Sequence, residues 1–184
     1  MERTGERRKP AIAADEPSLA ADLREVVIDP PDRTFVDAAT IEVGGRPVAL
    51  HFLGRGHTDH DAVIRVPGTD VVWAGDLIEN GAVPFFGDGY PIDWVATSAA
   101  LAQLVAPGVG VIVPGHGDHA GRDFAERQAG SFAALADLAR RVHGGELSRD
   151  EAVAAHPFPE HPRDDVRKPL ARALAQLRGE LVEK

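Results

Sequence analysis

The sequence predicts an α/β fold in which a mixed β-sheet is flanked by helices. Short apolar runs separated by turn residues fill residues 40–74, as expected for β-strands. In three later segments, apolar residues recur every three or four positions, as expected for helices that pack one face against a core. A β-branched run at residues 109–113 lies among these segments, so strand and helix alternate in the middle of the chain.

The first strands are expected as two hairpins. Residues 40–43 and 47–53 flank a Gly-Gly turn, which favours a tight hairpin connection. Residues 62–66 and 71–74 flank the sequence Pro-Gly-Thr-Asp, which is typical of a turn. We therefore expect the sheet to begin with antiparallel strands.

Helices and one further strand are expected in the second half of the chain. A helix is predicted at residues 91–105, between two prolines, and the strand at residues 109–113 is so apolar that both of its faces are expected to be buried. Three helices are then predicted, at residues 124–142, 149–155 and 166–182. Ser148 followed three residues later by Glu151 is a capping-box pattern at the start of the second.

The chain is expected to form one folded domain after a loose leader. Its 184 residues, 43% hydrophobic and 27% charged, suit a single globular core. Residues 1–30 are polar and predict a loose leader with a short helix near residues 19–27. An Asp-Pro-Pro-Asp sequence separates the leader from the domain at residues 31–184.

Composition excludes several classes of function. The net charge of −9, with no basic stripe, argues against a nucleic-acid partner. The chain has no cysteine, so any metal must be held by histidine, aspartate or glutamate. The first ten residues lead into no apolar run, and prolines and glycines interrupt the uncharged stretch at residues 94–117. We therefore expect a cytoplasmic protein without a secretory signal or membrane partner.

Three possible metal ligands each follow a predicted strand. His57 lies in a glycine-rich turn, Asp76 follows an apolar run, and His116 lies between two glycines after the last strand. Each residue alone is also compatible with ordinary turn chemistry. Because parallel neighbouring strands end at the same edge of a sheet, the three side chains can converge there.

The three motifs together resemble a known family. Gly-Arg-Gly-His-Thr-Asp at residues 54–59, Ala-Gly-Asp at 74–76 and Val-Pro-Gly-His-Gly at 113–117 are similar to the second half of a metallo-β-lactamase-fold hydrolase, over residues 29–140. The resemblance implies an αβ/βα sandwich, of which this chain contains mainly the second half. It also implies that His57 binds a first zinc ion and His116 a second. Asp76 would bridge the two and orient the bound water. Iron and manganese suit the same ligands.

The implied reaction is hydrolysis of a small molecule by a metal-bound hydroxide, on an ester, thioester, lactone or lactam. The family's H-x-H-x-D-H motif, which supplies four further ligands, is absent, and His51 is the only histidine before His57. The alternative is therefore a non-catalytic or truncated half-fold that needs a complementary chain or forms a homodimer. Typical zinc sites use at least three protein ligands.

Two groups of residues near the expected site have open roles. Phe85, Phe86 and Tyr90 lie in the loop after Asp76, and they form either a substrate wall or anchors that hold the loop to the core. His60 and His119 each lie three residues from an expected ligand, and they are either substitute ligands or solvated surface residues.

Overall fold

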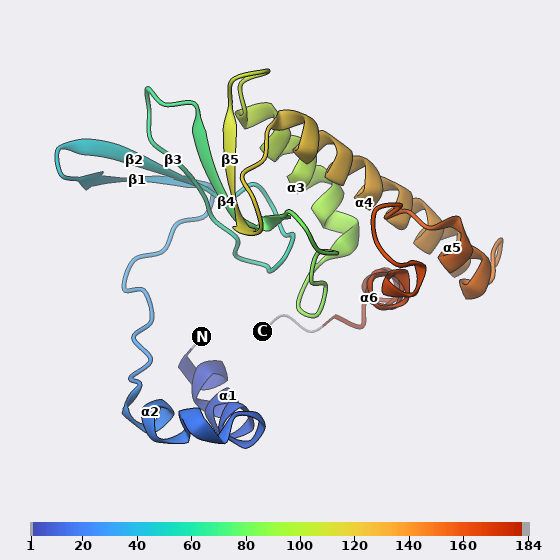
Figure 1. Ribbon diagram of the computed structural model, residues 1–184, viewed down its shortest axis with the longest axis horizontal. Helices are drawn as coiled ribbons and strands as arrows, with labels where there is room; N and C mark the ends of the chain where they lie inside the picture. Colours follow the sequence, from blue (N-terminus) through green and yellow to red (C-terminus); the bar gives the residue numbers. More distant parts are fainter. Residues whose placement is uncertain (1, 182–184) are drawn as a thin grey trace. The chain divides into compact units, whose positions relative to one another are not determined.

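The computed structural model describes residues 2–181, which form two compact units, one running to Phe35 and the other comprising Val36–Leu181 (Figure 1). The first unit contains helix α1 (Glu2–Asp15), a 3₁₀ turn (Pro17–Leu19) and helix α2 (Ala20–Glu25). Helix α2 corresponds to the short helix expected near residues 19–27, whereas α1 was not predicted, because its sequence is polar and contains an internal proline. No helix of the described residues is long and apolar enough to cross a membrane.

The second unit is built on a five-stranded mixed sheet. The strands are β1 (Ala38–Val43), β2 (Arg46–His51), β3 (Val63–Arg65), β4 (Val71–Glu79) and β5 (Val111–His116). They lie in sequence order, with antiparallel pairing from β1 to β4 and parallel pairing between β4 and β5. Both predicted hairpins and the mixed sheet are confirmed.

Two strand predictions were wrong in detail. Strand β4 was expected to end at residue 74 but continues to Glu79, because Leu77 and Ile78 return to the core after an irregularity in the pairing at Gly75. Asp76 therefore lies within the strand and not at its end. Strand β5 was expected to be buried on both faces, yet Ile112 is buried while Val111 is exposed. Within Val36–Leu181, the helices that pack on the core cover one face of the sheet.

The helices of this unit follow the predictions closely. They are α3 (Pro91–Leu104), α4 (Arg122–His143), α5 (Arg149–Ala155) and α6 (Arg167–Leu177), the last preceded by a 3₁₀ turn at Arg163–Val166. Helix α6 was expected to continue to residue 182, but it ends earlier, where Gly179 adopts a positive φ of 70°. Residue 182 lies outside the described residues.

The core lies between one face of the sheet and helices α3 and α4, which run side by side (Figure 1). Val72 and Ile112 of the sheet belong to the same buried cluster as Leu101 of α3. Within that cluster, four aromatic rings from separate parts of the sequence contact one another: Phe86, Trp94, Phe132 and Phe158. This packing supports the strand end and loops from which the candidate site is built.

Replacing Ser148 with alanine is expected to lower the free energy of unfolding by about 1 kcal/mol. The hydroxyl of Ser148 accepts a hydrogen bond from the backbone N–H of Glu151 (3.2 Å), and the Glu151 carboxylate accepts one from the backbone N–H of Ser148 (2.7 Å). Urea unfolding followed by circular dichroism measures the loss. Ser148→Thr, which keeps the hydroxyl, is expected to unfold close to wild type, and an equal loss in both variants would contradict the capping role.

Candidate functional site

Parallel pairing of β4 and β5 brings Asp76 and His116 to the same edge of the sheet. Gly75 lies opposite Pro114 and Glu79 opposite His116 in the register of the two strands. The backbone N–H of Asn80 donates to the carbonyl oxygen of His116 (3.0 Å). The two strand ends are therefore held together just beyond the candidate ligands.

His57 reaches this edge from the loop that follows β2. The carbonyl oxygen of Gly56 accepts a hydrogen bond from the backbone N–H of Tyr90 (2.8 Å), which holds the loop against the start of α3. A Cβ atom on Gly56 would lie 2.4 Å from Leu77 Cδ2 and 3.0 Å from Trp94 Cδ1. Only glycine permits the loop to pack so closely on the core, and His57 follows it directly.

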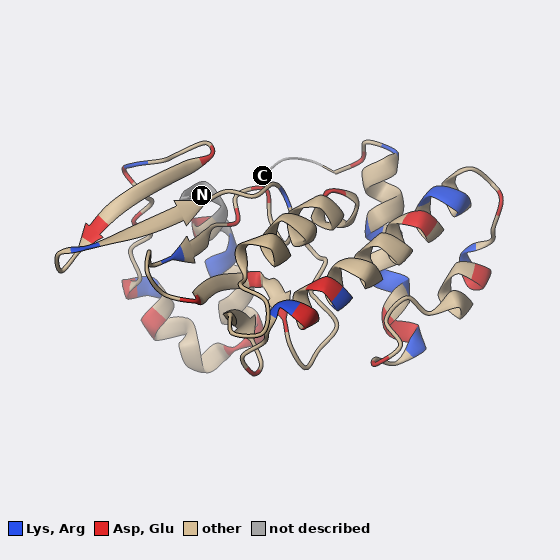
Figure 2. Cartoon of the chain, turned by 90° about the horizontal axis from the view of Figure 1, so that it is seen from above, with Lys and Arg blue, Asp and Glu red and all other residues tan. Residues whose placement is uncertain are grey.

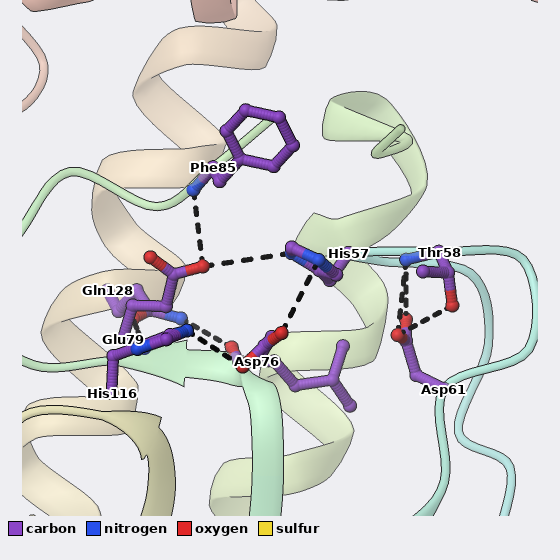
Figure 3. Close-up of polar contacts among 9 residues, drawn as sticks. His57, Thr58, Asp61, Asp76, Glu79, Phe85, His116 and Gln128 are labelled. Atoms are coloured by element: carbon purple, nitrogen blue, oxygen red, sulfur yellow. Dashed lines mark hydrogen bonds and ion pairs between the residues drawn. The ribbon is translucent and has the colours of Figure 1, made fainter. Parts of the chain in front are cut away.

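Asp76 lies between the two histidines, as Figure 3 shows. Its Oδ2 is 3.5 Å from His57 Nε2, and its Oδ1 is 3.7 Å from His116 Nε2. The structure thus brings all three predicted residues together, with each carboxylate oxygen facing a different imidazole. Both separations exceed a normal hydrogen bond of about 2.7–3.2 Å.

Glu79 is a fourth ionisable residue at this site, and its presence here was not predicted from the sequence. Its side chain is 6% exposed, and its Oε1 lies 3.7 Å from His57 Nδ1 (Figure 3). Burial raises the pKa of Glu79, an effect partly opposed by the hydrogen bond that its carboxylate accepts from the backbone N–H of Phe85 (3.2 Å). A charged residue at the end of a strongly apolar run was the signal available in the sequence.

Gln128 of helix α4 fixes the end of β4 beneath Glu79. Its side-chain nitrogen donates to the carbonyl oxygen of Leu77 (2.7 Å), and its side-chain oxygen accepts from the backbone N–H of Glu79 (3.3 Å). Gln128 is itself buried. These two bonds satisfy buried backbone groups where the strand pairing is irregular, and so they stabilise the backbone that carries Asp76 and Glu79.

His57 is enclosed on its other sides by aromatic rings. The Trp94 ring is 5.9 Å away in an edge-on arrangement, and the Phe85 ring is 6.1 Å away. The Nδ1 atom of His57 is buried and has no hydrogen-bond partner among the described residues. Within the part of the chain that the structure describes, neither ring nitrogen makes a hydrogen bond of normal length, although each faces a carboxylate.

The three aromatic residues of the loop after β4 divide into two roles. Phe85 is 62% exposed beside His57, whereas Phe86 and Tyr90 are each 4% exposed and belong to the buried interior. Phe86 contacts the core rings of Trp94 and Phe132. Phe86 and Tyr90 therefore pack into the interior, and of the three rings only that of Phe85 is exposed beside His57.

Asp61 stabilises the loop that carries His57. Its carboxylate accepts hydrogen bonds from the hydroxyl of Thr58 (2.8 Å) and from the Thr58 backbone N–H (3.1 Å) (Figure 3). Burial raises the pKa of Asp61, and these two hydrogen bonds oppose the effect. His60 does not take part in this loop contact, because its exposed ring pairs with Asp59.

An open groove of about 1190 Å³ lies next to the site. Glu79 and Asn80 line one part of it, and His119 and residues of α4 line another. His57, Asp76 and His116 are not among its lining residues. The groove therefore adjoins the histidine–aspartate arrangement through Glu79 but does not contain it.

His57, Asp76 and His116 can supply part of a metal centre but do not form a complete one. Among the described residues, no group of three or more histidine, aspartate or glutamate side chains is arranged to hold a metal ion. Two donors around a tetrahedral zinc ion lie about 3.3–3.6 Å apart, given zinc–ligand bonds of about 2.0–2.2 Å. The 3.5 Å and 3.7 Å separations in the two histidine–aspartate pairs are close to this value. Each pair supplies two donors, one fewer than catalytic zinc sites commonly use.

Comparison with known proteins adds independent findings. Residues 2–116 match the family model of the metallo-beta-lactamase superfamily. A metallo-beta-lactamase type 2 of Bacteroides fragilis is 28% identical over 98 residues, covering 52% of this chain and 39% of that protein. A protein of the same description from Elizabethkingia meningoseptica is 31% identical over 88 residues, covering 46% and 35%.

Among solved structures, a metallo-beta-lactamase from Pontibacter korlensis superposes with a TM-score of 0.51 at 22% identity, covering 67% of this chain and 54% of that one. This likeness concerns the fold. The matches span 39% and 35% of the lengths of the two curated relatives. Each of these relatives is therefore considerably longer than the region that it shares with this chain.

Proposed function

Because the chain belongs to the metallo-beta-lactamase superfamily, we propose that it acts as a metal-dependent hydrolase in which His57, Asp76 and His116 are metal ligands. One observation carries the proposal: the two oxygens of the Asp76 carboxylate face two different imidazole nitrogens, at 3.5 Å and 3.7 Å. A carboxylate placed in this way can bridge two cations and offset their mutual repulsion.

The surroundings of these side chains also support a metal-dependent hydrolase. Zinc bound here would supply a Lewis acid and a water molecule of lowered pKa. The exposed ring of Phe85, beside His57, offers an apolar surface to the acyl part of an ester, thioester, lactone or lactam. Iron and manganese remain alternatives to zinc, because histidine and aspartate suit all three.

The second candidate function is that of a half-fold that supplies part of a metal centre and takes its other ligands from a different polypeptide. The observation that favours it is the lack of any three-ligand group among the described residues. In this case the chain binds metal weakly by itself and hydrolyses nothing until the other ligands are present. Both candidates assign the same role to Asp76.

Asp76→Asn is expected to weaken zinc binding by the full-length chain at least about tenfold, because the amide is neutral and coordinates through only one oxygen. Isothermal titration with zinc measures the affinity and the number of ions bound. Asp118→Asn is a matched control: this residue also carries a carboxylate and lies two positions from His116. It is exposed, and the contact with Asn80 uses its backbone oxygen.

The outcomes separate the two candidates. Nearly two zinc ions per chain, with hydrolysis of an ester or lactone panel that Asp76→Asn abolishes, supports the hydrolase. Weak binding that is still lost in Asp76→Asn, with no hydrolysis, supports the half-fold. Equal zinc affinity in wild type, Asp76→Asn and Asp118→Asn would overturn both.

A further inference from the structure

The imidazole of His57 lies between two carboxylates, and each of its ring nitrogens faces a different one. Nε2 lies 3.5 Å from Asp76 Oδ2, and Nδ1 lies 3.7 Å from Glu79 Oε1 (Figure 3). A neutral imidazole carries one proton, so one nitrogen is an N–H donor while the other offers a lone pair. Only the nitrogen with the lone pair can bind a metal ion. The position of this proton therefore decides which nitrogen of His57 is able to serve as a ligand.

The two carboxylates differ in their access to water. The side chain of Glu79 is 6% exposed, whereas that of Asp76 is 38% exposed. The Nδ1 atom of His57, which faces Glu79, is itself buried and has no hydrogen-bond partner among residues 2–181. Charges interact more strongly where water is excluded. The Glu79 carboxylate therefore acts on Nδ1 more strongly than the Asp76 carboxylate acts on Nε2, although the two distances are similar.

The Glu79 carboxylate is held beside Nδ1 by two neighbouring groups. The backbone N–H of Phe85 donates to its Oε1 (3.2 Å), and the side chain of Gln128 accepts from the backbone N–H of Glu79 (3.3 Å). Most charged residues of the chain lie on helices and loops, and the strand ribbons are mainly uncharged (Figure 2). No lysine or arginine is among the groups that shift the pKa of Glu79. Because a buried carboxylate is costly without a donor, the environment of Glu79 favours an N–H at Nδ1 of His57.

The two possible positions of the proton on His57 differ in free energy. With the proton on Nε2, the lone pair of Nδ1 faces the buried carboxylate of Glu79, and water does not reach this nitrogen to screen the repulsion. With the proton on Nδ1, the N–H faces Glu79, and the lone pair of Nε2 faces the more exposed carboxylate of Asp76. The second arrangement is the more stable one, and it leaves Nε2 available to a metal ion.

We propose that Glu79 is a positioning residue for His57: its carboxylate keeps the proton on Nδ1 and so directs the lone pair of Nε2 toward Asp76 and the candidate metal site. Closing the separation from 3.7 Å to about 3.0 Å completes a hydrogen bond between the two side chains. A carboxylate that accepts the second N–H of a ligand histidine fixes both its tautomer and the orientation of its ring. The consequence for metal binding rests on the proposed function, whereas the proton position itself does not depend on a metal.

The test is the position of the proton on His57, measured by long-range proton–nitrogen NMR on the metal-free, isotope-labelled full-length chain. The spectra are recorded at about pH 9, where imidazole groups are generally neutral, and His57→Gln assigns the His57 signal by its loss. Wild type is expected to carry the proton mainly on Nδ1. Glu79→Leu is expected to move it to Nε2, because Asp76 is then the carboxylate that faces the ring. Asp118→Asn, which removes an exposed carboxylate two positions from His116, is the control and is expected to leave the proton on Nδ1.

A second variant covers the case in which Glu79→Leu does not fold, as judged by circular dichroism. Glu79→Gln keeps an oxygen near Nδ1 but loses the charge, so its proton distribution is expected to lie between those of wild type and Glu79→Leu. A wild-type His57 that is doubly protonated, or that carries its proton on Nε2, would overturn the proposal. A proton position that the folded Glu79 variants leave unchanged would do the same.

Zinc titration provides a second readout. Glu79→Leu is expected to weaken zinc affinity by about 10–100-fold, as is typical when the partner of a ligand histidine is lost. Wild type and Asp118→Asn are expected to bind zinc equally. Since the NMR measurement requires no metal, failure of this role for Glu79 is distinguishable from failure of the proposed function, which the titration of Asp76→Asn tests.

Discussion

Trp94→Ala is expected to lower the free energy of unfolding by about 3–5 kcal/mol, a large part of the stability of a domain of this size. Trp94 is fully buried, and its ring lies 4.7 Å from Phe132 and 5.2 Å from Phe86. Its removal leaves a cavity between the start of α3 and helix α4. Because Trp94 also contacts His57, at 5.9 Å between ring centres, the candidate site is expected to loosen as well.

Trp94→Phe separates the two contributions of the indole. The indole N–H is buried without a hydrogen-bond partner among the described residues, and phenylalanine removes it while keeping a ring against Phe132. The expected loss is therefore clearly smaller than for alanine. Urea unfolding followed by circular dichroism measures both variants, and Val109→Ala serves as an exposed control. Equal losses for Trp94→Ala and Trp94→Phe would contradict the assignment of the effect to ring burial.

Gly117→Ala is expected to lower the free energy of unfolding by about 2–5 kcal/mol, combining backbone strain with a steric clash. Gly117 has a φ of 85°, which alanine adopts only at a cost. A Cβ atom there would lie 1.5 Å from the carbonyl oxygen of Asn80, which is backbone and has little freedom to move. Displacing Asn80 would break its hydrogen bond to the carbonyl oxygen of His116.

Gly68→Ala is the matched control for that prediction. Gly68 has nearly the same φ, 83°, but no atom lies within 4 Å of a Cβ built on it. This variant is expected to show the backbone cost alone, about 1–2 kcal/mol. Urea unfolding measures both variants, and the difference between them gives the cost of the clash with Asn80. Equal destabilisation would show that β4 and β5 tolerate separation at the candidate site.

The chemistry-bearing residues were predictable where the local sequence carries the signal. Glycines around His57 and His116 indicate sharp turns, and the apolar run before Asp76 indicates a buried strand. These three motifs identified the family, which the match over residues 2–116 confirms. Their roles as metal ligands stay a prediction, because no three-ligand group is present among the described residues.

Glu79 and its environment could not be predicted in the same way. Its burial depends on Gln128, which lies 49 residues further along the chain and holds the backbone at Glu79. The difference between exposed Phe85 and buried Phe86 likewise depends on Trp94, Phe132 and Phe158, which occupy the space beneath Phe86. The residues that are nearby in the sequence do not indicate either of these long-range contacts.

The sequence by itself determined the hairpins, the helices of the second half, the capping box at Ser148 and the three residues that converge at the sheet edge. Each of these follows from local patterns, because turn geometry and the periodicity of apolar residues are set by neighbouring positions. Only the tertiary structure decided that Glu79 faces His57 and that, within Val36–Leu181, Val111 of β5 is exposed while Ile112 is buried. The physical reason is that burial depends on which distant elements pack against a residue, and a strand with two apolar faces does not specify which face will be covered.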